Sequence, residues 1–306
     1  MKSKTGFWAV CLLVLLGVHQ GYTQIVAGGP GAFLRSGVGV RALGLGGAFS
    51  AIADDPSAGF WNPAGLAQLN ELQLQFSVYH LSRDRRQSYI SVAAPFGLRG
   101  SLGLSWVGFQ VSGIEARSAN TPDPDFVFRN SNHLFLFTFA YRIFSGVYLG
   151  GNFKMLYQTL HQVSALSTGL DAGVLLFPLN YLRLAVVLRD VRHSLQWSNG
   201  RKERVPTSLR IAAALHLTSN FLLSADLHKT ASRSFSLSVG TEYVALNRLP
   251  IRIGYLDHTV VAGGGLDVYL RTFDLRLDYA YGKDFLDGGD VHKLSIGLSF
   301  FRPHAQ

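Results

Sequence analysis

The sequence predicts an all-β protein: a transmembrane antiparallel up-and-down β-barrel of about 14 strands with an N-terminal hatch, or plug, segment. Three observations support this fold class. Apolar and small polar residues alternate with a period of two over most of the chain, charged residues make up only 15% of the 306 residues, and aromatic residues reach 12%. Soluble domains carry about 25% charged residues, whereas apolar and polar side chains alternate along the strands of a membrane barrel.

The first twenty residues, MKSKTGFWAVCLLVLLGVHQ, contain two lysines followed by an apolar run from Phe7 to Val18. A run of this length is too short for a transmembrane helix and is typical of a secretory signal peptide. We therefore predict a cleaved signal peptide over residues 1–22. The single cysteine, Cys11, lies inside this segment, so the mature chain would have no disulfide and no cysteine nucleophile or metal ligand.

A glycine-rich segment, residues 25–70, precedes the first predicted strand. Eight glycines lie between Gly28 and Gly47, and a glycine-rich chain can pack closely in a confined space. A barrel of 14 strands is wide enough that its lumen must be filled or conduct. We therefore predict that residues 25–70 form a hatch inside the barrel.

Two prolines in the predicted hatch indicate short helices. In DDPSAGF, Asp55 can cap a helix that begins at Pro56, and in WNPAGL, Asn62 can cap a helix that begins at Pro63. A small polar cap followed by proline at the first helical position is a strong signal for a helix start. We expect two helical turns in tandem, with the aromatic pair 60–61 facing the barrel wall.

Regular alternation begins at Leu72. In LQLQFSVY, residues 72–79, the apolar side chains alternate with Gln73, Gln75 and Ser77, so an extended segment has one apolar and one polar face. Most such segments have about 9–11 residues, the length that crosses a bilayer at a tilt. This pattern predicts a barrel over residues 71–301, with fourteen strands near 72–80, 88–95, 101–109, 133–141, 147–158, 167–177, 181–189, 206–217, 221–228, 235–243, 251–256, 264–270, 273–281 and 292–300.

The connections between the predicted strands alternate in length. Residues 110–132, 189–205 and 282–291 are long and polar, whereas PLN, residues 178–180, is a tight turn. Long outer loops and short periplasmic turns are typical of outer-membrane barrels. A soluble β-sandwich is the alternative, but LFLFTFAY, residues 134–141, is apolar on both faces, which would be costly to expose to water.

The segment RALGLGGAFSAIADDPSAGFWNPAGLAQL, residues 41–69, resembles the N-terminal signature of the PorV/PorQ family. That family belongs to the wider FadL-like barrels, which share the DD…NPAG element, fourteen strands and an N-terminal hatch. The resemblance implies an outer-membrane protein. Some PorV/PorQ members serve type IX secretion by carrying or tethering cargo, whereas FadL relatives pass hydrophobic molecules through the barrel wall. This chain is shorter than typical members of either kind, so elaborate outer binding loops are not expected.

Two groups of residues are candidates for function. The hatch motif could bind a ligand or gate passage, although folding the plug is a sufficient role for it: Arg41, Asp54, Asp55, Pro56, Trp61, Asn62, Pro63, Ala64 and Gly65. Charges of both signs stand opposite apolar neighbours on the strands, which predicts a charge network that lines the lumen and holds the plug: Lys154, Asp171, Arg252, Asp267, Asp274, Arg276 and Asp278, with Asn152, Arg183, Arg210, Asp226 and Glu242 on the same face. We expect Arg41 to pair with one of the lumen acids.

The sequence contains no recognisable catalytic motif. Asp54 and Asp55 are adjacent and would point apart, which does not suit an acid/base pair. The ten histidines have no metal-ligand spacing, and no G-x-S-x-G elbow or nucleotide-binding glycine loop is present. We therefore expect no catalytic residues, no metal, no cofactor and no enzymatic activity. An enzyme that acts on outer-membrane lipid through strand Ser and His residues is a third hypothesis.

Basic clusters lie in the predicted outer loops, and the formal net charge is +9. Arginine suits the phosphates of lipopolysaccharide, whereas a solvated loop tip is the alternative: Arg83, Arg85 and Arg86 in one loop, and Arg201, Lys202 and Arg204 in another. Nucleic acid is not expected as a partner of an exported barrel. The predicted partners are outer-membrane lipid, lipopolysaccharide and, for a secretion role, secretion-system subunits or secreted cargo.

Two functions are consistent with these features of an outer-membrane protein. The first hypothesis is a non-catalytic accessory component of type IX-like protein secretion, which the mixed-charge lumen favours. The alternative is a FadL-like transporter or channel for small hydrophobic solutes, in which the hatch around Asn62 and Pro63 gates passage.

Overall fold

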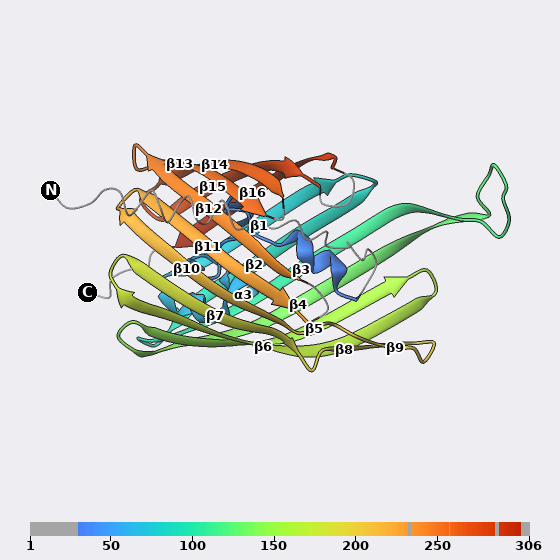
Figure 1. Ribbon diagram of the computed structural model, residues 1–306, viewed down its shortest axis with the longest axis horizontal. Helices are drawn as coiled ribbons and strands as arrows, with labels where there is room; N and C mark the ends of the chain where they lie inside the picture. The colour runs from blue at the N-terminus through green and yellow to red at the C-terminus, as the bar shows by residue number, and fades with distance from the viewer. Residues whose placement is uncertain (1–29, 232–233, 257, 285–287, 301–306) are drawn as a thin grey trace.

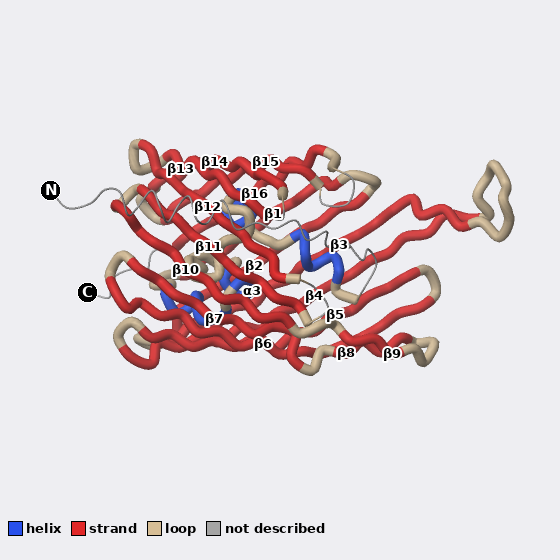
Figure 2. Tube along the Cα trace, in the orientation of Figure 1, coloured by secondary structure: helices blue, strands red, loops and turns tan. Residues whose placement is uncertain are grey.

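The computed structural model describes residues 30–231, 234–256, 258–284 and 288–300. Sixteen strands and four short helices occur in this part of the chain. Fourteen strands close into an antiparallel barrel, and the other two form a hairpin at one of its ends (Figures 1 and 2). The predicted signal peptide, residues 1–22, lies outside the described residues.

Each barrel strand pairs with its neighbours in chain order, and β1 pairs with β16 to close the barrel. Each of the fourteen predicted strands overlaps one observed strand, which confirms the predicted fold class. The barrel strands are β1 (Leu72–Leu81), β2 (Arg85–Phe96), β3 (Gly100–Ala116), β4 (Phe126–Phe144), β5 (Val147–Leu160), β6 (Val163–Leu179), β7 (Leu182–Val191), β10 (Ser208–Thr218), β11 (Phe221–Thr230), β12 (Phe235–Ala245), β13 (Leu249–Leu256), β14 (Thr259–Tyr269), β15 (Phe273–Lys283) and β16 (Asp290–Phe300).

Side chains alternate between the lumen and the outer surface. In β1, Gln75, Ser77 and Tyr79 are buried, whereas Phe76 between them is 45% exposed. Large apolar side chains are exposed around the whole wall, as a lipid-facing surface requires; examples are Ile90, Phe137, Val186, Ile211 and Ile253. None of the helices in the described ranges is long and apolar enough to cross a membrane.

The two ends of the barrel differ. At the end where the hatch leads into β1, the strands are joined by short turns, such as residues 145–146, 180–181 and 219–220. The β3–β4 hairpin projects from the opposite end (Figure 1). Short turns are typical of the periplasmic end of a barrel and longer connections of the outer end, so we refer to these as the periplasmic and outer ends.

Two of the predicted outer loops contain strand. The prediction of a loop over 110–132 is wrong for most of its length, because β3 continues to Ala116 and β4 begins at Phe126. β2 pairs with β3 only as far as Val111, so the rest of the hairpin stands clear of the barrel. Beyond the bilayer neither face of a hairpin has to be apolar, which is why the alternation was lost there. Residues 189–205 likewise contain the hairpin of β8 (Ser194–Trp197) and β9 (Lys202–Arg204).

The described part of the predicted hatch, residues 30–70, lies inside the barrel and supplies much of the buried core. Its helices are η1 (Ala32–Ser36), α2 (Val40–Gly44), α3 (Ala58–Trp61) and η2 (Pro63–Gln68). The helix predicted to begin at Pro56 begins two residues later, because Pro56 and Ser57 form a turn in which the Ala58 amide donates to the Asp55 carbonyl at 2.9 Å. The start predicted at Pro63 is confirmed, and Asn62 is its N-cap.

Candidate functional site

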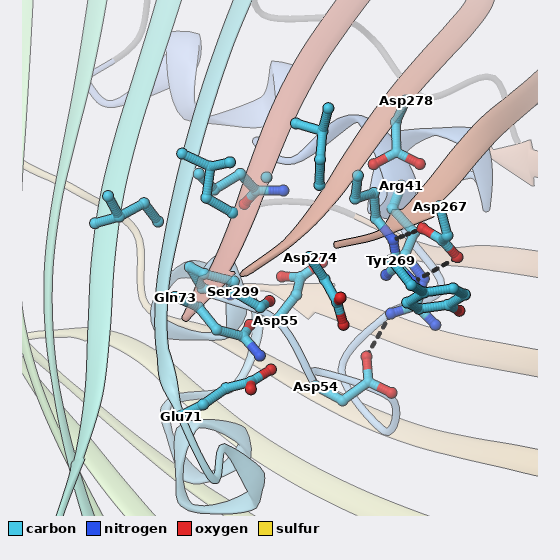
Figure 3. A pocket seen from close by; sticks show the side chains of 17 residues that line it. Arg41, Asp54, Asp55, Glu71, Gln73, Asp267, Tyr269, Asp274, Asp278 and Ser299 are labelled. Carbon is cyan, nitrogen blue, oxygen red and sulfur yellow. Dashed lines mark hydrogen bonds and ion pairs between the residues drawn. The ribbon is translucent and has the colours of Figure 1, made fainter. Parts of the chain in front are cut away.

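Arg41, in α2, lies at the centre of a chain of ion pairs between the hatch and β12–β15. Its Nη2 is 2.9 Å from Glu242 Oε1. Its Nη1 is 2.5 Å from Asp54 Oδ1 (Figure 3). Arg252 continues the chain, because its Nε donates to Glu242 Oε2 and its Nη1 to Asp278 Oδ1, both at 2.6 Å. The expected pairing of Arg41 with a lumen acid is therefore present, and it joins the hatch to three strands.

Asp54 and Asp55 are neighbours in sequence but have different partners. Burial alone would raise the pKa of Asp54, but the guanidinium groups of Arg41 and Arg183 outweigh burial and hold this pKa below its usual value. Burial raises the pKa of Asp55, whose Oδ1 accepts from the Ser57 amide at 2.8 Å and the Ser57 hydroxyl at 2.5 Å. The two carboxyl groups therefore lie in different electrostatic environments.

The turn at Asn62 and Ala64 packs directly on glycines of the wall. A Cβ atom at Gly150, in β5, would lie 2.3 Å from the Ala64 amide nitrogen. A Cβ atom at Gly173, in β6, would lie 2.2 Å from Asn62 Oδ1. Only glycine permits this approach of hatch and wall, so the two glycines form a seat for the turn. Both glycines lie inside predicted strands, and their contacts with the hatch were not predicted.

The Asn62 side chain satisfies groups on three segments. Its Oδ1 accepts from the Ala64 amide at 3.1 Å, and its Nδ2 donates to the Ser50 carbonyl at 2.9 Å and to the Val174 carbonyl at 3.3 Å. Asn62 thus caps η2, ties it to the preceding hatch segment and links both to β6. Its role is positional, and a role in gating remains a prediction.

Pro56 and Gly65 hold the hatch through backbone atoms. The Pro56 carbonyl accepts from the Tyr89 hydroxyl at 3.2 Å and from Ser91 Oγ at 3.0 Å, both in β2. A Cβ atom at Gly65 would lie 2.1 Å from the Ala53 carbonyl oxygen, so η2 and the preceding turn are in direct contact.

Trp61 faces the wall as expected. Its Nε1 donates to the Val38 carbonyl at 2.9 Å, and the Arg210 guanidinium lies 5.1 Å from the ring centroid. The Arg189 guanidinium lies 4.4 Å from the ring centroid of the neighbouring Phe60. Both aromatic rings thus contact cations of the lumen wall.

The predicted lumen charges do not form one network. Lys154, in β5, belongs to a second cluster, in which its Nζ lies 3.2 Å from Asp171 Oδ1 and 2.5 Å from Asp190 Oδ1. Arg276 pairs separately with Asp267 at 2.6 Å. The sequence did not indicate Asp190, because it follows an arginine at the end of a strand, where a loop residue is expected.

A cavity of about 300 Å³ lies between the hatch and β1, β14, β15 and β16 (Figure 3). Asp274 Oδ1 and Gln75 Oε1 are buried side-chain acceptors in its lining, and neither has a hydrogen-bond partner in the described part of the chain. The charged lining residues are Arg41, Asp54, Asp55, Glu71, Asp267, Asp274, Arg276 and Asp278. This size suits a small molecule, and the lining is polar. Among the described residues, no group of three His, Cys, Asp or Glu side chains is placed to hold a metal.

Residues 32–167, less than half of the chain, match the sequence profile of the uncharacterised protein family UPF0164. No curated protein sequence matches the chain.

Several solved structures have the same architecture. The CymD monoaromatic hydrocarbon channel is similar with a TM-score of 0.63 and 14% identity, over 88% of this chain and 99% of that one. A FadL homologue from Pseudomonas aeruginosa is similar with a TM-score of 0.62 and 13% identity, over 86% of this chain and 98% of that one. The toluene transporter TodX from P. putida is similar with a TM-score of 0.60 and 13% identity, over 81% of this chain and 95% of that one.

The fold and the site define a transmembrane β-barrel that is filled by its own N-terminal hatch. Within that class, the chain has the fold of the FadL-like outer-membrane barrels. At 12 to 14% identity, the likeness concerns the fold.

Proposed function

We propose that this protein is an outer-membrane channel for small hydrophobic solutes and that its hatch gates passage. The proposal rests on one observation: a fourteen-strand barrel closed around an N-terminal hatch, shared over nearly the whole length of a protein named as a monoaromatic hydrocarbon channel. The named neighbours are channels or transporters. This favours the transport hypothesis over the secretion role that we ranked first from the sequence.

The lumen charges no longer favour the secretion role. Arg41, Glu242 and Arg252 contact one another and the hatch, so they seat the plug instead of lining an open path. A type IX-like accessory role now has only the PorV/PorQ resemblance of residues 41–69 in its support. It would require secretion-system subunits or cargo to copurify with the protein.

A disulfide between the hatch and the wall tests the gate. Gly44 in α2 and Gly263 in β14 face each other: a Cβ at Gly44 would lie 3.4 Å from Gly263 Cα, and a Cβ at Gly263 would lie 3.2 Å from Gly44 Cα. Cysteines at these two positions would therefore be adjacent, which a disulfide requires. We expect a Gly44→Cys/Gly263→Cys protein in liposomes to take up toluene or a labelled fatty acid when reduced and to stop when oxidised.

The two single-cysteine variants, treated with the same oxidant, are the matched controls and should keep full uptake. Uptake that continues through the oxidised double variant would show that α2 need not leave the wall. If the wild-type protein takes up no apolar probe and instead copurifies with secretion subunits, the transport proposal is wrong and the secretion role replaces it.

We also propose contact with lipopolysaccharide phosphates at the outer end. Arg85 is removed from the predicted basic cluster, because it is buried and its Nη2 lies 2.7 Å from Asp284 Oδ2. The other five basic residues are exposed: Arg83, Arg86, Arg201, Lys202 and Arg204. Replacing these five by glutamine should weaken binding to lipopolysaccharide and leave binding to a dephosphorylated form unchanged; equal binding of both forms by the wild-type protein would contradict the proposal.

A further inference from the structure

A chain of three buried side chains lies near the outer end of the lumen wall, apart from Arg41. Ser167 Oγ, in β6, is 2.9 Å from His193 Nε2, and His193 Nδ1 is 3.0 Å from Asp190 Oδ1. Their residues are 4%, 0% and 8% exposed. A hydroxyl, an imidazole and a carboxylate joined through both ring nitrogens is the arrangement that activates a serine nucleophile.

The backbone around His193 is shaped to hold this arrangement. Asp190 and Arg192 have φ values of 58° and 53°, left-handed conformations that are unfavourable for residues other than glycine. They turn the chain after β7 so that His193 returns over β6. There the ring lies on Gly169, where a Cβ atom would be only 2.7 Å from His193 Cγ. Backbone strain on both sides of Val191 and close packing of His193 on Gly169 indicate a ring whose position matters.

The carboxylate of Asp190 is fixed by the Lys154 cluster. Lys154 Nζ lies 2.5 Å from Asp190 Oδ1, and the Asp190 amide donates to Asp171 Oδ1 at 2.8 Å. The Asp190 carboxylate is the charged group that directly contacts the imidazole. That charge would stabilise the imidazolium that forms when Ser167 gives up its proton.

Two further features suit a reaction at Ser167. Trp197 Nε1 is buried and has no hydrogen-bond partner among the described residues, although buried N–H groups are nearly always paired. Trp197, in β8, stands opposite Ala165, two residues from Ser167 on the same face of β6. A cavity of about 290 Å³ lies beside the cluster and is lined by Arg192, His193, Ser194, Arg204 and Thr207.

We propose that Ser167 is a nucleophile that hydrolyses carboxylic esters with apolar acyl groups, a second activity beyond transport. Ser167 Oγ bonds to the ester carbonyl carbon while its proton passes to His193 Nε2. The bond to the alcohol oxygen then breaks, and the alcohol leaves with that proton. Water attacks the acyl-serine, again through His193, and releases the acid. Asp190 is a positioning residue, and Leu156, opposite Ser167 in β5, is the apolar cross-strand neighbour of the nucleophile.

Labelling of the wild-type protein tests the nucleophile directly. The full-length protein in detergent is treated with an alkyl fluorophosphonate, and the modified peptide is identified by mass spectrometry. We expect the label on Ser167 and its loss in His193→Ala. Hydrolysis of p-nitrophenyl butyrate should fall at least about 10³-fold in Ser167→Ala.

Ser105→Ala is the matched control, because Ser105 is also a buried lumen serine, 2.8 Å from Ser91 Oγ, and has no histidine partner. This variant should keep wild-type turnover. Asp190→Asn should lower kcat more than it changes KM and should shift the pH profile of kcat, which a purely structural carboxylate would not do. The proposal is overturned if the wild-type protein is unlabelled at Ser167 and hydrolyses the ester no faster than Ser167→Ala. That outcome would leave the uptake result untouched.

Discussion

The hatch is held on two sides of the lumen, and its backbone packs on glycines of the wall on both sides. Toward β12–β15, a Cβ atom at Gly254 would lie 2.1 Å from the Gly46 amide nitrogen, and the charged side chain of Arg41 also reaches Glu242 over 2.9 Å. Toward β5 and β6, the turn at Asn62 presses its backbone against glycines, and hardly any charge is involved. The ion pair needs both partners in their charged forms, whereas the glycine seat needs only shape. We therefore expect the Arg41 side, and not the Asn62 side, to weaken when a partner of the ion pair loses its charge.

The largest effect is expected at the glycine seat. Gly150→Ala would bring a Cβ atom to 2.3 Å from the Ala64 amide nitrogen, and backbone on both sides cannot yield. Overpacking of this kind should destabilise hatch docking by about 3 kcal/mol. Hydrogen exchange of residues 58–68 would report it as lost protection. Gly151→Ala is the control, because its nearest atom is 3.4 Å away; equal loss in both variants would contradict the seat.

Breaking the Arg41 ion pair should destabilise hatch docking less than Gly150→Ala does. Arg41→Met leaves Glu242 paired with Arg252 at 2.6 Å, so we expect a loss of about 2 kcal/mol instead of the 3–5 usual for a broken buried pair. Exchange protection should fall in residues 40–47 and persist in 62–66. Arg276→Met removes a similar pair, to Asp267 in the wall, and should leave both segments protected. Simultaneous loss across the whole hatch would refute the two-sided attachment.

Asn62→Ala should have a smaller effect than either change. It removes the cap of η2 and the donors to Ser50 and Val174, and a lost cap costs about 1 kcal/mol. Thermal unfolding monitored by tryptophan fluorescence would measure this loss of stability. If Asn62→Ala were as damaging as Gly150→Ala, the side chain, and not the glycine seat, would carry this side of the hatch.

The smallest effects should come from the two adjacent acids, with opposite dependence on pH. The lowered pKa of Asp54 means that its stabilising contribution is present above the unfolded value near 4 and is lost as pH falls through the lower folded value. Asp54→Asn should therefore cost about 1 kcal/mol at pH 7, reduced by the 27% exposure of the side chain, and the difference from wild type should vanish in acid.

The raised pKa of Asp55 reverses the sign: this carboxyl stabilises the fold below its unfolded pKa and loses that contribution as pH rises through the folded value. Asparagine keeps the acceptor for Ser57, so Asp55→Asn should be neutral or stabilising at pH 7. The free energy of unfolding of Asp54→Asn and Asp55→Asn, measured between pH 3 and 8 and compared with wild type, would check both predictions. Equal losses at pH 7 would show that the two acids do not differ as described.

Periodicity predicted the fold because the bilayer imposes it. Every strand that crosses the bilayer must present an apolar face to lipid. The spacing of residues such as Phe76 and Ile90 from their apolar neighbours is therefore enough to predict a strand. The outer hairpin of β3 and β4 is under no such constraint, and residues 110–132 therefore looked like a loop. The start of η2 was predictable for a local reason, since Asn62 and Pro63 act on their own neighbours.

The contacts between distant segments could not be predicted from the sequence. Ser167 and His193 are 26 residues apart and meet only because the chain turns sharply after β7. Gly150 and Gly173 look like weak points in their strands until the hatch is placed against them. Arg41 was expected to find an acid, but the choice of Glu242 among several candidates depends on strand register, which alternation does not determine.

The position of the hatch constrains the order in which the protein assembles. Arg41 and Glu242 are 201 residues apart, so the hatch, although made early, cannot dock until most of the wall exists; such long-range contacts form slowly. The β1–β16 pairing then seals the cylinder from Leu72 to His80. A hatch still outside at that moment would have to enter past the rim. The pairing of β1 with β16 is therefore the step of assembly that decides whether the closed barrel contains its hatch.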